Sequence, residues 1–592
     1  MATSWGSRAA RGWPASAEGF CGSVRGRRYV ILDRADPCHG GQLVDDSRRT
    51  GAELAAEAIA KTGGDTLFTL PGSHIAKILD HARRLGIRVV NVRHEENAVM
   101  MAEGMALATG RPGFAAVTAG PGLANAMAGI AEANLAGAPV VVLAGRTAVA
   151  RRGIGAVQDL DQLAMVRPVT KWAAECLEPG RIPEYLAEAV RRASWGDPGV
   201  AYLEIPEDVL HQLGEGSPVW VPEAPRSVPA PADLERALQL LKEAERPLIL
   251  AGSGAFFSGA GDALRRFMER TGIPLTTTSG ARGLVDDSHP LSLGTLVHGG
   301  AALVGASLAL ILGSRFNANL MYGRVPLFGE EQSVVQLDLR PEHLGGPRSP
   351  QLGLSGDVAA TLDLLSERWD ASPERWSEWV MQARSAAEAS WEMWSEEASA
   401  PAQPLHPGWL AREAAKIFDQ LPEPGTWISD GGDSVPWGIA FSRAHFPGSN
   451  MLIGSALGTL GVGLPFAIGA GLARPRRPLL LFSGDGAFGF SAMELQTAVN
   501  HGVGLVVVVV NNGVWRGPGT APSQVGREVD HAALARSLGG WGARAEDQES
   551  FLRVLPEALE MARDGIPCVV DARADGKVVS NLLRSLDDLG LM

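Results

Sequence analysis

The sequence predicts an α/β protein made of three doubly wound, parallel-sheet domains. Two observations carry this prediction. Short apolar strands alternate with helical stretches along most of the 592 residues, and this alternation restarts twice after proline-rich or tryptophan-rich connections. Near-continuous apolar strands that alternate with helices are typical of a parallel sheet covered on both faces. At roughly 100–200 residues per domain, the length also suits this division.

The first region, 48–215, opens with the helical pattern "TGAELAAEAIAKTG". Its strand-like segments are "TLFTL", "IRVVNV", "GFAAVT", "APVVVLAG" and "GVAYLEIP". A proline-rich stretch, 216–233, follows. Because proline blocks helix and stiffens the chain, we expect an extended linker there.

The second region, 234–366, repeats the pattern with "PLILAGSG", "IPLTTT", "LALILGSRF" and "VVQLDL". Residues 367–404 then predict a linker helix, whose tryptophans at 376, 379, 391 and 394 recur at near-helical spacing and should pack on a neighbour. The third region, 405–592, includes a C-terminal tail, and its strands are "TWISD", "LLLFSGD", "LVVVVVNN" and "CVVDA".

Composition excludes several classes of protein. The net charge of −13 argues against a nucleic-acid-binding surface, and no apolar run reaches the ~18 residues of a membrane span. The four cysteines form no CxxC pair, so neither a disulfide framework nor a zinc site is indicated. We therefore expect a cytoplasmic protein with no nucleic-acid or membrane partner.

Residues 1–47 read as a leader outside the folded domains. Residues 1–30 carry five arginines and one acidic residue. This composition is similar to that of a transit peptide, and a misplaced start codon or plain disorder explains it equally well.

Two polar sites end neighbouring apolar strands in the third region. Asp485 lies between Gly484 and Gly486, and Asn512 ends the next strand. In open parallel sheets, ligands bind beyond the carboxyl ends of the strands. A carboxylate, an amide oxygen and the backbone carbonyl of Val514 are ligands suited to Mg²⁺, and the N–H groups after Gly486 could cradle phosphate. Alone, each residue would be a helix cap or a turn residue.

"GDG" followed by "NN" at this spacing resembles the thiamine diphosphate motif of the acetohydroxyacid synthase and pyruvate oxidase-like superfamily. The resemblance covers about residues 50–575. It implies a pyrimidine-binding domain (48–215), a central domain (234–366) and a diphosphate-binding domain (405–592). It also implies Mg²⁺ binding by Asp485, Asn512 and the Val514 carbonyl. The implied cofactor-binding residues further include Gly432, Asp433, Ser434, Gly458, Leu460, Gly486, Ala487 and Trp515.

The resemblance also implies a carboxylic acid that faces the pyrimidine ring of the cofactor. "VRHEENAVMMAEG" matches the family's "RHE" segment, with Glu95 at the family position and Glu96 as the second choice. Leu460 would wedge between the two rings of the cofactor, and the Gly458 carbonyl would hold the aminopyrimidine. In this family the acid and the metal site of one active site come from different subunits. We therefore expect a homodimer or homotetramer.

Other residues bear on the reaction. The segment "FTLPGSHIAKILD", with a histidine at position 74, resembles the corresponding segment of benzaldehyde lyase and of one branch of the 2-hydroxyacyl-CoA lyases. The segment "GDGAFGFSAMELQTA" resembles that of oxalyl-CoA decarboxylase and 2-hydroxyacyl-CoA lyase. The segment "NNGVWRGPG" lacks the "QWQ" of true acetohydroxyacid synthases. It is one residue shorter than the corresponding segment of the enzymes that act on acyl-CoA, so the resemblance assigns no CoA-binding residue to this chain. Gln158 is a candidate pocket residue in any of these enzymes. FAD or ADP in the central domain is not predicted.

These features favour a thiamine diphosphate-dependent C–C lyase or carboligase that acts on 2-hydroxyacyl-CoA or 2-hydroxy ketone substrates, with His74 and Glu95 as catalytic residues. The alternative is an acetolactate synthase-like decarboxylating transferase that acts on pyruvate. A third hypothesis, from another class, is a cofactor-binding regulatory or structural homologue without turnover. The substrate, and whether it is linked to CoA, cannot be read from the sequence.

Overall fold

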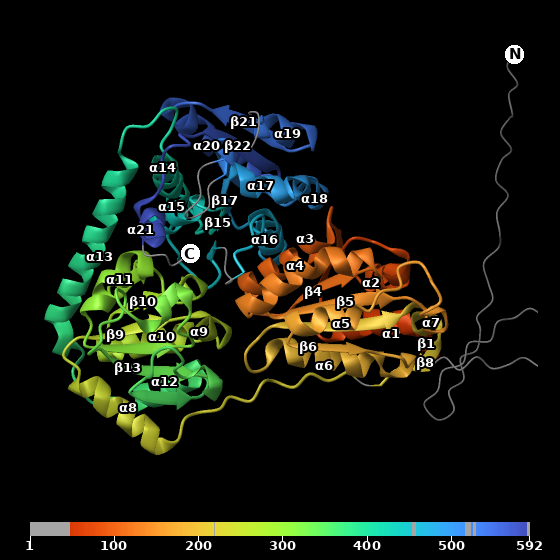
Figure 1. Cartoon of the computed structure of the whole chain (residues 1–592), viewed down its shortest axis with the longest axis horizontal. Helices are drawn as coiled ribbons and strands as arrows, with labels where there is room; N and C mark the ends of the chain where they lie inside the picture. Colours follow the sequence, from red (N-terminus) through yellow and green to blue (C-terminus); the bar gives the residue numbers. More distant parts are fainter. Residues whose placement is uncertain (1–47, 218, 453–456, 516–522, 525–528, 589–592) are drawn as a thin grey trace, which may run out of the picture.

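Each of the three regions folds around a six-stranded sheet whose strands are all parallel, which confirms the predicted fold class (Figure 1). The computed structural model describes residues 48–217, 219–452, 457–515, 523–524 and 529–588. The leader predicted at 1–47 lies outside the described residues. Within the described ranges, no helix combines the length and apolar character needed to cross a membrane.

The first sheet has the order β3-β2-β4-β5-β7-β6. Its strands are β2 (Thr66–Thr69), β3 (Arg88–Asn91), β4 (Gly113–Val117), β5 (Val140–Arg146), β6 (Trp172–Glu175) and β7 (Val200–Pro206). The longer helices of this domain are α1 (Gly51–Lys61), α2 (Ala76–Arg84), α3 (Glu95–Thr109), α4 (Pro121–Ala136) and α6 (Ile182–Ser194). An antiparallel pair, β1 (Arg48–Thr50) and β8 (Leu213–Glu215), joins the two ends of the domain.

The central sheet has the order β11-β10-β9-β12-β13-β14. Its strands are β9 (Pro247–Ala251), β10 (Leu275–Thr277), β11 (Ser292–Thr295), β12 (Leu308–Leu312), β13 (Ser333–Asp338) and β14 (Leu352–Ser355). Its helices include α8 (Pro231–Glu243), α10 (Gly261–Thr271), α11 (Leu296–Gly305) and α12 (Val358–Glu367). Residues 219–230, which lead into this domain, form neither helix nor strand and run as the yellow connection in Figure 1.

The third sheet has the order β16-β15-β17-β18-β22-β21. Its strands are β15 (Thr426–Asp430), β16 (Asn450–Leu452), β17 (Leu479–Gly484), β18 (Leu505–Asn511), β21 (Trp541–Ala545) and β22 (Pro567–Arg573). Its helices are α14 (Pro407–Asp419), α15 (Ser434–Phe441), α16 (Gly463–Ala473), α17 (Asp485–Ser491), α18 (Leu495–His501), α19 (His531–Ser537), α20 (Gln548–Arg563) and α21 (Asn581–Asp588). Two further strands, β19 (Val514–Trp515) and β20 (Ser523–Gln524), pair with each other.

The strand order divides the domains into two kinds. When the sheet strands of each domain are numbered along the chain, the first and third sheets both read 2-1-3-4-6-5. The central sheet reads 3-2-1-4-5-6, the order typical of dinucleotide-binding domains. The two outer domains therefore share one topology, and the central domain has another.

Within the three six-stranded sheets, the sequence did not predict five strands, β6, β11, β14, β16 and β21. All but β11 and β14 belong to the outer domains, and all five lie at or next to a sheet edge. The side chains of β6 are only partly buried, and those of β11 and β14 mix buried and partly exposed positions. Edge strands of this kind produce no continuous apolar run, which is the signal the prediction used.

A long helix, α13 (Ser377–Ala398), leads from the central domain to the third domain along one side of the molecule (Figure 1). Trp376, just before it, and Trp379 and Trp394 within it are buried, as the spacing predicted. Trp391 is 46% exposed, so the expectation that all four tryptophans pack on a neighbour is wrong for this residue. Its position turns it toward solvent while Trp394 contacts Trp437 edge-to-face.

Helices α3 and α16 join the outer domains into one body (Figure 1). The contact is close because glycines lie on both sides of it. A Cβ atom built on Gly104 would lie 2.5 Å from the Cα of Phe466, and one built on Gly469 would lie 2.1 Å from the carbonyl oxygen of Met101. A continuous apolar core extends from the first sheet across these helices to the third sheet.

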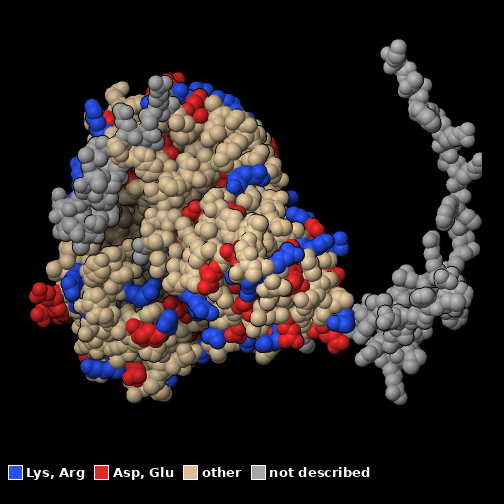
Figure 2. All heavy atoms as spheres, turned by 45° about the vertical axis from the view of Figure 1, so that its right-hand side comes forward, with Lys and Arg blue, Asp and Glu red and all other residues tan. Residues whose placement is uncertain are grey.

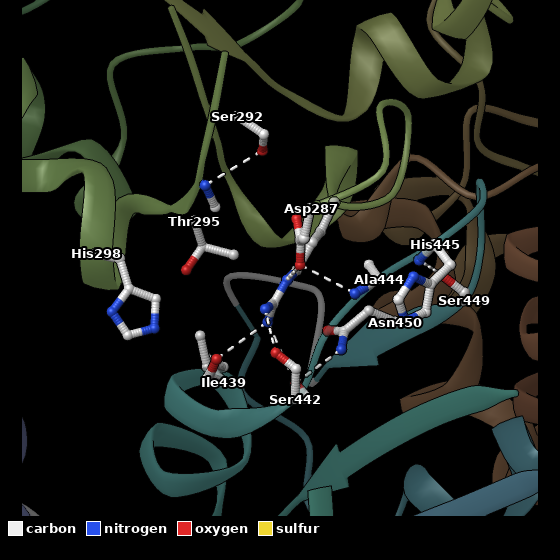
Figure 3. A network of polar contacts seen from close by, with 12 residues as sticks. Asp287, Ser292, Thr295, His298, Ile439, Ser442, Ala444, His445, Ser449 and Asn450 are labelled. Carbon is white, nitrogen blue, oxygen red and sulfur yellow. Dashed lines mark hydrogen bonds and ion pairs between the residues drawn. The ribbon is translucent and has the colours of Figure 1, made fainter. Parts of the chain in front are cut away.

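The central domain docks on the third domain through a buried arginine (Figure 3). Arg282, 4% exposed, pairs with Asp287 at 3.0 Å and donates to the backbone carbonyl of Ile439 and to Ser442. Asp287 in turn accepts the N–H of Ala444. Because the charge is paired with Asp287 and the other hydrogen bonds of Arg282 cross to helix α15 or the segment after it, this network fixes how the two domains sit together.

Candidate active site

Three of the predicted residues meet at the loop between β4 and α4, where Gly120 has a φ of +65°. The Oγ1 atom of Thr118 lies 3.2 Å from Nδ1 of His74. A Cβ atom built on Gly122 would lie 2.8 Å from Cγ2 of Thr118 and 3.6 Å from Oε1 of Glu95. His74 and Glu95, 21 positions apart in the sequence, therefore lie beside this loop and the first turn of α4 that follows it.

Glu95 is the first residue of α3 and is 5% exposed. A carboxylate at this end of a helix benefits from the partial positive charge of the free N–H groups. The Oε2 atom of Glu95 accepts a hydrogen bond of 3.0 Å from Nδ2 of Asn125 on α4. This bond leaves Oε1 free of any hydrogen bond within the described residues, so one carboxylate oxygen remains to act on a ligand.

Glu96, the second choice at this position, lies in a different setting. Its carboxylate lies 3.8 Å from Nδ1 of His94, and desolvation raises its pKa above the usual range. Within the described residues, its side chain makes no hydrogen bond or ion pair with the loop that His74 contacts. Glu95 therefore stays the predicted residue for this role.

His74 lies in a short 3-10 turn, Ser73–Ile75, after β2. Burial lowers the pKa of His74 below its ordinary value of 6.5, which favours the neutral imidazole. A Cβ atom built on Gly145, on β5, would lie 2.4 Å from the Cβ of His74, so only glycine leaves room for this histidine. A neutral imidazole beside a hydroxyl can accept a proton at neutral pH.

Gln158 also contacts this loop. It has a φ of +62°, an uncommon conformation for a residue other than glycine. A Cβ atom built on Gly120 would lie 2.8 Å from the Cβ of Gln158. Backbone strain of this kind clusters at functional sites, where the surrounding structure holds it.

The sequence analysis missed Gln162, which holds the same loop. It is fully buried, and its Oε1 accepts the N–H of Gly120 at 2.8 Å. Its Nε2 donates to the Gly145 carbonyl, to the Tyr202 hydroxyl and to Glu204. These contacts span up to 42 positions, so no local pattern could reveal them.

In the third domain, Asp485 follows β17 and begins α17. It is 6% exposed, its Oδ1 accepts the N–H of Gly486 at 2.9 Å and its Oδ2 accepts the N–H of Gly513 at 2.8 Å. Burial raises the pKa of Asp485, and the two backbone hydrogen bonds oppose that shift. Among described residues no cationic side chain pairs with this carboxylate. A bound cation would therefore stabilise its buried negative charge.

The two asparagines after β18 have different roles. Asn511 is buried, and its Nδ2 donates to Asp571 and to the Val529 carbonyl, so it is structural. Asn512 is partly exposed, and its Oδ1 accepts the N–H of Val514 at 3.0 Å. This turn directs Asn512 and the Val514 segment toward the loop of Asp485, because Gly513 between them bonds to that carboxylate.

Trp515 covers the start of α17. A Cβ atom built on Gly486 would lie 2.8 Å from the indole, and the same ring meets Phe490 edge-to-face at 6.1 Å. Ala487 is buried, 3.5 Å from the Cβ position of Gly431. The glycines are therefore required where the segments after β15, β17 and β18 approach one another.

The three predicted residues after β15, Gly432, Asp433 and Ser434, lie in different surroundings. Ser434 is buried, with its Oγ 3.1 Å from the Cβ position of Gly484, and Gly432 is exposed. The carboxylate of Asp433 accepts from the N–H and hydroxyl of Ser580 and from Nε1 of Trp437. The side chain of Asp433 thus links the start of α15 to the C-terminal segment.

Asp430, which the sequence analysis did not select, fixes the segment that carries Leu460. Its buried carboxylate accepts the N–H groups of Gly461 at 3.3 Å and Gly463 at 2.9 Å, and burial raises the pKa of Asp430 to about 6. Leu460 is partly buried directly before this contact, and Gly458 has a φ of +68° with open space at its Cβ position.

The donor set is suited to a hard cation bound with phosphate. The described residues contain no group of three or more His, Cys, Asp or Glu side chains that could hold a metal ion by themselves. Asp485, Asn512 and the Val514 carbonyl offer a carboxylate, an amide oxygen and a backbone oxygen. Mg²⁺ typically takes few protein ligands and completes its shell with phosphate oxygens and water, so these residues fit it.

Within the described part of one chain, no hydrogen bond or ion pair links Glu95, His74 or Gln158 to Asp485 or Asn512. The two halves of the predicted site are each assembled by their own domain.

Comparisons with known proteins agree with this division. Residues 49–165 match the thiamine pyrophosphate enzyme N-terminal TPP binding domain, 234–365 match the central domain, and 430–572 match the C-terminal TPP binding domain. A probable acetolactate synthase of Mycobacterium bovis is 34% identical, over 89% of this chain and 96% of that protein. The 2-hydroxyacyl-CoA lyase 2 of Homo sapiens is 31% identical over 92% of each chain, and the 2-hydroxyacyl-CoA lyase of Oryza sativa subsp. japonica is 30% identical over 88% and 95%.

The three domains match in the family's order, and the relatives align along nearly the whole chain. The strand ends also present the residues that the resemblance implied. The chain therefore belongs to the thiamine pyrophosphate (thiamine diphosphate) enzyme family.

Proposed function

We propose that this protein is a thiamine diphosphate-dependent C–C lyase or carboligase that acts on 2-hydroxyacyl-CoA or 2-hydroxy ketone substrates. The observation that carries the proposal is the position of His74, which shares a loop with Glu95 through Thr118. A lyase that cleaves a C–C bond without loss of CO₂ needs a base near the substrate hydroxyl. A histidine kept neutral by burial suits that task.

The third domain would hold the cofactor. Asp485, Asn512 and the Val514 carbonyl would bind Mg²⁺, and the N–H groups at the start of α17 would contact the diphosphate. When bound, thiamine diphosphate supplies a nucleophilic carbon that adds to a carbonyl group. Leu460 would shape the bound conformation, and Trp515 would cover the diphosphate end.

The first domain would supply the proton chemistry. Glu95 would exchange a proton with the pyrimidine ring through Oε1, the oxygen that Asn125 does not occupy. His74 would take the proton of the substrate hydroxyl as the C–C bond breaks, and Gln158 would line the pocket beside it. The aldehyde product and the second carbonyl product would then leave, or the same steps would run in reverse.

An acetolactate synthase-like reaction on pyruvate is the second candidate, because the relative in Mycobacterium bovis bears that name at 34% identity. A turnover screen separates the two. The purified protein with Mg²⁺ and thiamine diphosphate is offered pyruvate, benzoin and a 2-hydroxyacyl-CoA. Aldehyde release from benzoin or the hydroxyacyl-CoA supports the lyase, and turnover of pyruvate alone replaces it with the synthase-like reaction.

The proposal includes a homodimer or homotetramer in which Glu95 of one chain faces the diphosphate-binding domain of another. Large apolar side chains are exposed next to both halves of the site. Phe490, Met493 and Trp515 lie in the third domain, and Ile154 and Val157 lie in the first. Figure 2 shows a broad face with few charged residues beside a densely charged one. Sedimentation analysis with and without cofactor tests the assembly, and a monomer would contradict it.

We also propose a cytoplasmic location, because Cys176 and Cys568 are buried free thiols that suit a reducing compartment. FAD or ADP in the central domain is not part of this proposal. The loops after β9 and β12 pack on each other there, with the N–H of Gly254 donating to the carbonyl of Gly313 at 3.0 Å.

A further inference from the structure

A buried carboxylate of the third domain reaches the start of the helix that carries Glu95. Glu494 ends the 3-10 turn Ala492–Glu494 after α17 and is fully buried. Its Oε1 accepts the N–H of Arg93 and the Nδ2 of Asn97, both at 2.8 Å. Its Oε2 accepts the hydroxyl of Thr497 at 2.6 Å.

The residues that Glu494 holds lie on either side of Glu95. Arg93 precedes α3, and Asn97 lies in its first turn, where its N–H donates to the His94 carbonyl at 3.1 Å. The hydroxyl of Thr497 also lies 3.3 Å from the carbonyl of Asn91, the last residue of β3. The whole strand-to-helix turn that carries Glu95 is thus fixed by one segment of another domain.

The other contact of the Glu95 side chain is weaker as a restraint. Asn125 donates one hydrogen bond to Oε2, from within the same domain. It cannot set where the first turn of α3 lies, because that turn is the part that Glu494 and Thr497 hold. The direction of the Glu95 side chain therefore depends on two sets of contacts. Asn125 binds its carboxylate, and Glu494 binds the backbone N–H of Arg93 and the side chain of Asn97 on either side of it.

We propose that Glu494 is a positioning residue for the reaction, one that acts through Arg93 and Asn97 to aim the carboxyl group of Glu95. This inference rests on the proposed function, in which Glu95 exchanges a proton with the cofactor. Removal of a residue that orients a metal ligand typically costs about 10- to 100-fold in metal affinity or activity, and we expect a loss of similar size when the residue that orients Glu95 is removed. The geometry predicts that this loss appears in proton exchange, while cofactor affinity is retained.

Two substitutions separate the hydrogen bonds of Glu494 from its charge. Glu494→Gln keeps an Oε1 acceptor for Arg93 and Asn97, and its amide can donate to Thr497, whose hydroxyl still reaches Asn91. Glu494→Ala leaves all three donors without that partner. Asn97→Ala removes the contact from the side of α3, which keeps the inference testable if Glu494→Ala does not fold. Asn500→Ala, at an exposed position of α18, is the matched control.

Two measurements are made on the full-length protein. Hydrogen–deuterium exchange in the absence of cofactor reports the amides of residues 93–99. The rate of C2-proton exchange of bound thiamine diphosphate in D₂O, followed by NMR, reports Glu95. Glu494→Ala and Asn97→Ala should lose amide protection at 93–99 and slow C2-proton exchange by about 10- to 100-fold. Glu494→Gln and Asn500→Ala should match the wild type in both.

The outcomes distinguish the two proposals. If the wild-type protein with Mg²⁺ binds no thiamine diphosphate, or never exchanges the C2 proton, the proposed function fails. If the wild type exchanges that proton and Glu494→Ala exchanges it equally fast, the positioning role of Glu494 is refuted. Equal loss in Glu494→Gln and Glu494→Ala would also refute it, because the role would then belong to the charge and not to the hydrogen bonds.

Discussion

The first and third domains share the strand order 2-1-3-4-6-5, yet they present opposite chemistry at their strand ends. In the first domain, His74 follows strand one and Glu95 follows strand two, and under the proposed function both move protons. In the third, Asp485 follows strand three and Asn512 follows strand four, and under the proposed function both bind a cation. One topology thus serves two tasks, and the residues at the strand ends decide which.

The two carboxylates are also held in different ways. A side chain, Asn125, binds Glu95, while two backbone N–H groups bind Asp485. A side-chain partner leaves an oxygen free for proton transfer. A backbone cradle occupies both oxygens of Asp485 and fixes the direction of the remaining lone pairs, which suits a ligand that must not move.

The largest effect is expected in the third domain. Asp485→Ala should abolish turnover and weaken binding of thiamine diphosphate with Mg²⁺ by more than the roughly 100-fold typical of a lost outer-shell partner. Calorimetric titration measures this. Asp547→Ala, at an exposed helix cap of the same domain, is the control and should bind as the wild type does. Unchanged affinity in Asp485→Ala would remove the metal assignment.

The first domain should respond differently. Glu95→Gln should bind the cofactor with Mg²⁺ but slow exchange of its C2 proton by ~10²- to 10⁴-fold, because an amide cannot take up and return a proton. NMR in D₂O measures the rate. Glu96→Gln is the matched control and should exchange as the wild type does. If the effects are interchanged, the role belongs to Glu96.

A smaller effect is expected at His74. His74→Ala should slow C–C cleavage by ~10²-fold and leave cofactor binding intact. Since burial lowers the pKa of His74 below 6.5, the wild-type rate should fall only at pH values below 6.5, where the imidazole becomes protonated. The cleavage rate of the His74→Ala variant should not show this fall at low pH. Cleavage of hydroxyacyl substrates at the wild-type rate by His74→Ala would favour the synthase-like alternative.

The smallest effect concerns the central domain, which lies outside this comparison. Burial lowers the pKa of His298 to about 4, and its Nε2 lies 2.8 Å from the Ala440 carbonyl of α15. Because the unfolded chain takes up this proton near pH 6.5 and the folded chain near 4, folded stability should fall as pH drops through this window. By linkage the loss is about 2 kcal/mol at pH 5.

Denaturant unfolding at pH 7.5 and pH 5 measures this loss. His298→Gln should lose about 2 kcal/mol less than the wild type over that range, and its cofactor affinity should be unchanged. His211→Gln, at an exposed position, should follow the wild type. A change in cofactor affinity in His298→Gln would mean that the central domain takes part in the site.

The sequence predicted the fold class and the buried strands, since strands such as β18 are apolar throughout. It missed five of the six edge strands of these sheets, which are short and carry no continuous apolar run. It also singled out the residues that end strands, His74, Glu95, Asp485 and Asn512. It missed Asn125, Gln162 and Glu494, because these act through contacts with residues 17 to 401 positions away, which no local pattern records.

Helix α3 follows the second strand of its sheet, and α16 follows the second strand of its own, so equivalent helices of two like-folded domains meet through Gly104 and Gly469. A surface that packs on its own counterpart is self-complementary, which is the requirement for a symmetric homodimer. The outer domains therefore meet through equivalent elements, as the two subunits of a symmetric dimer do. A gene that encoded one such domain would already have encoded its partner surface, and duplication with fusion would keep that interface inside a single chain.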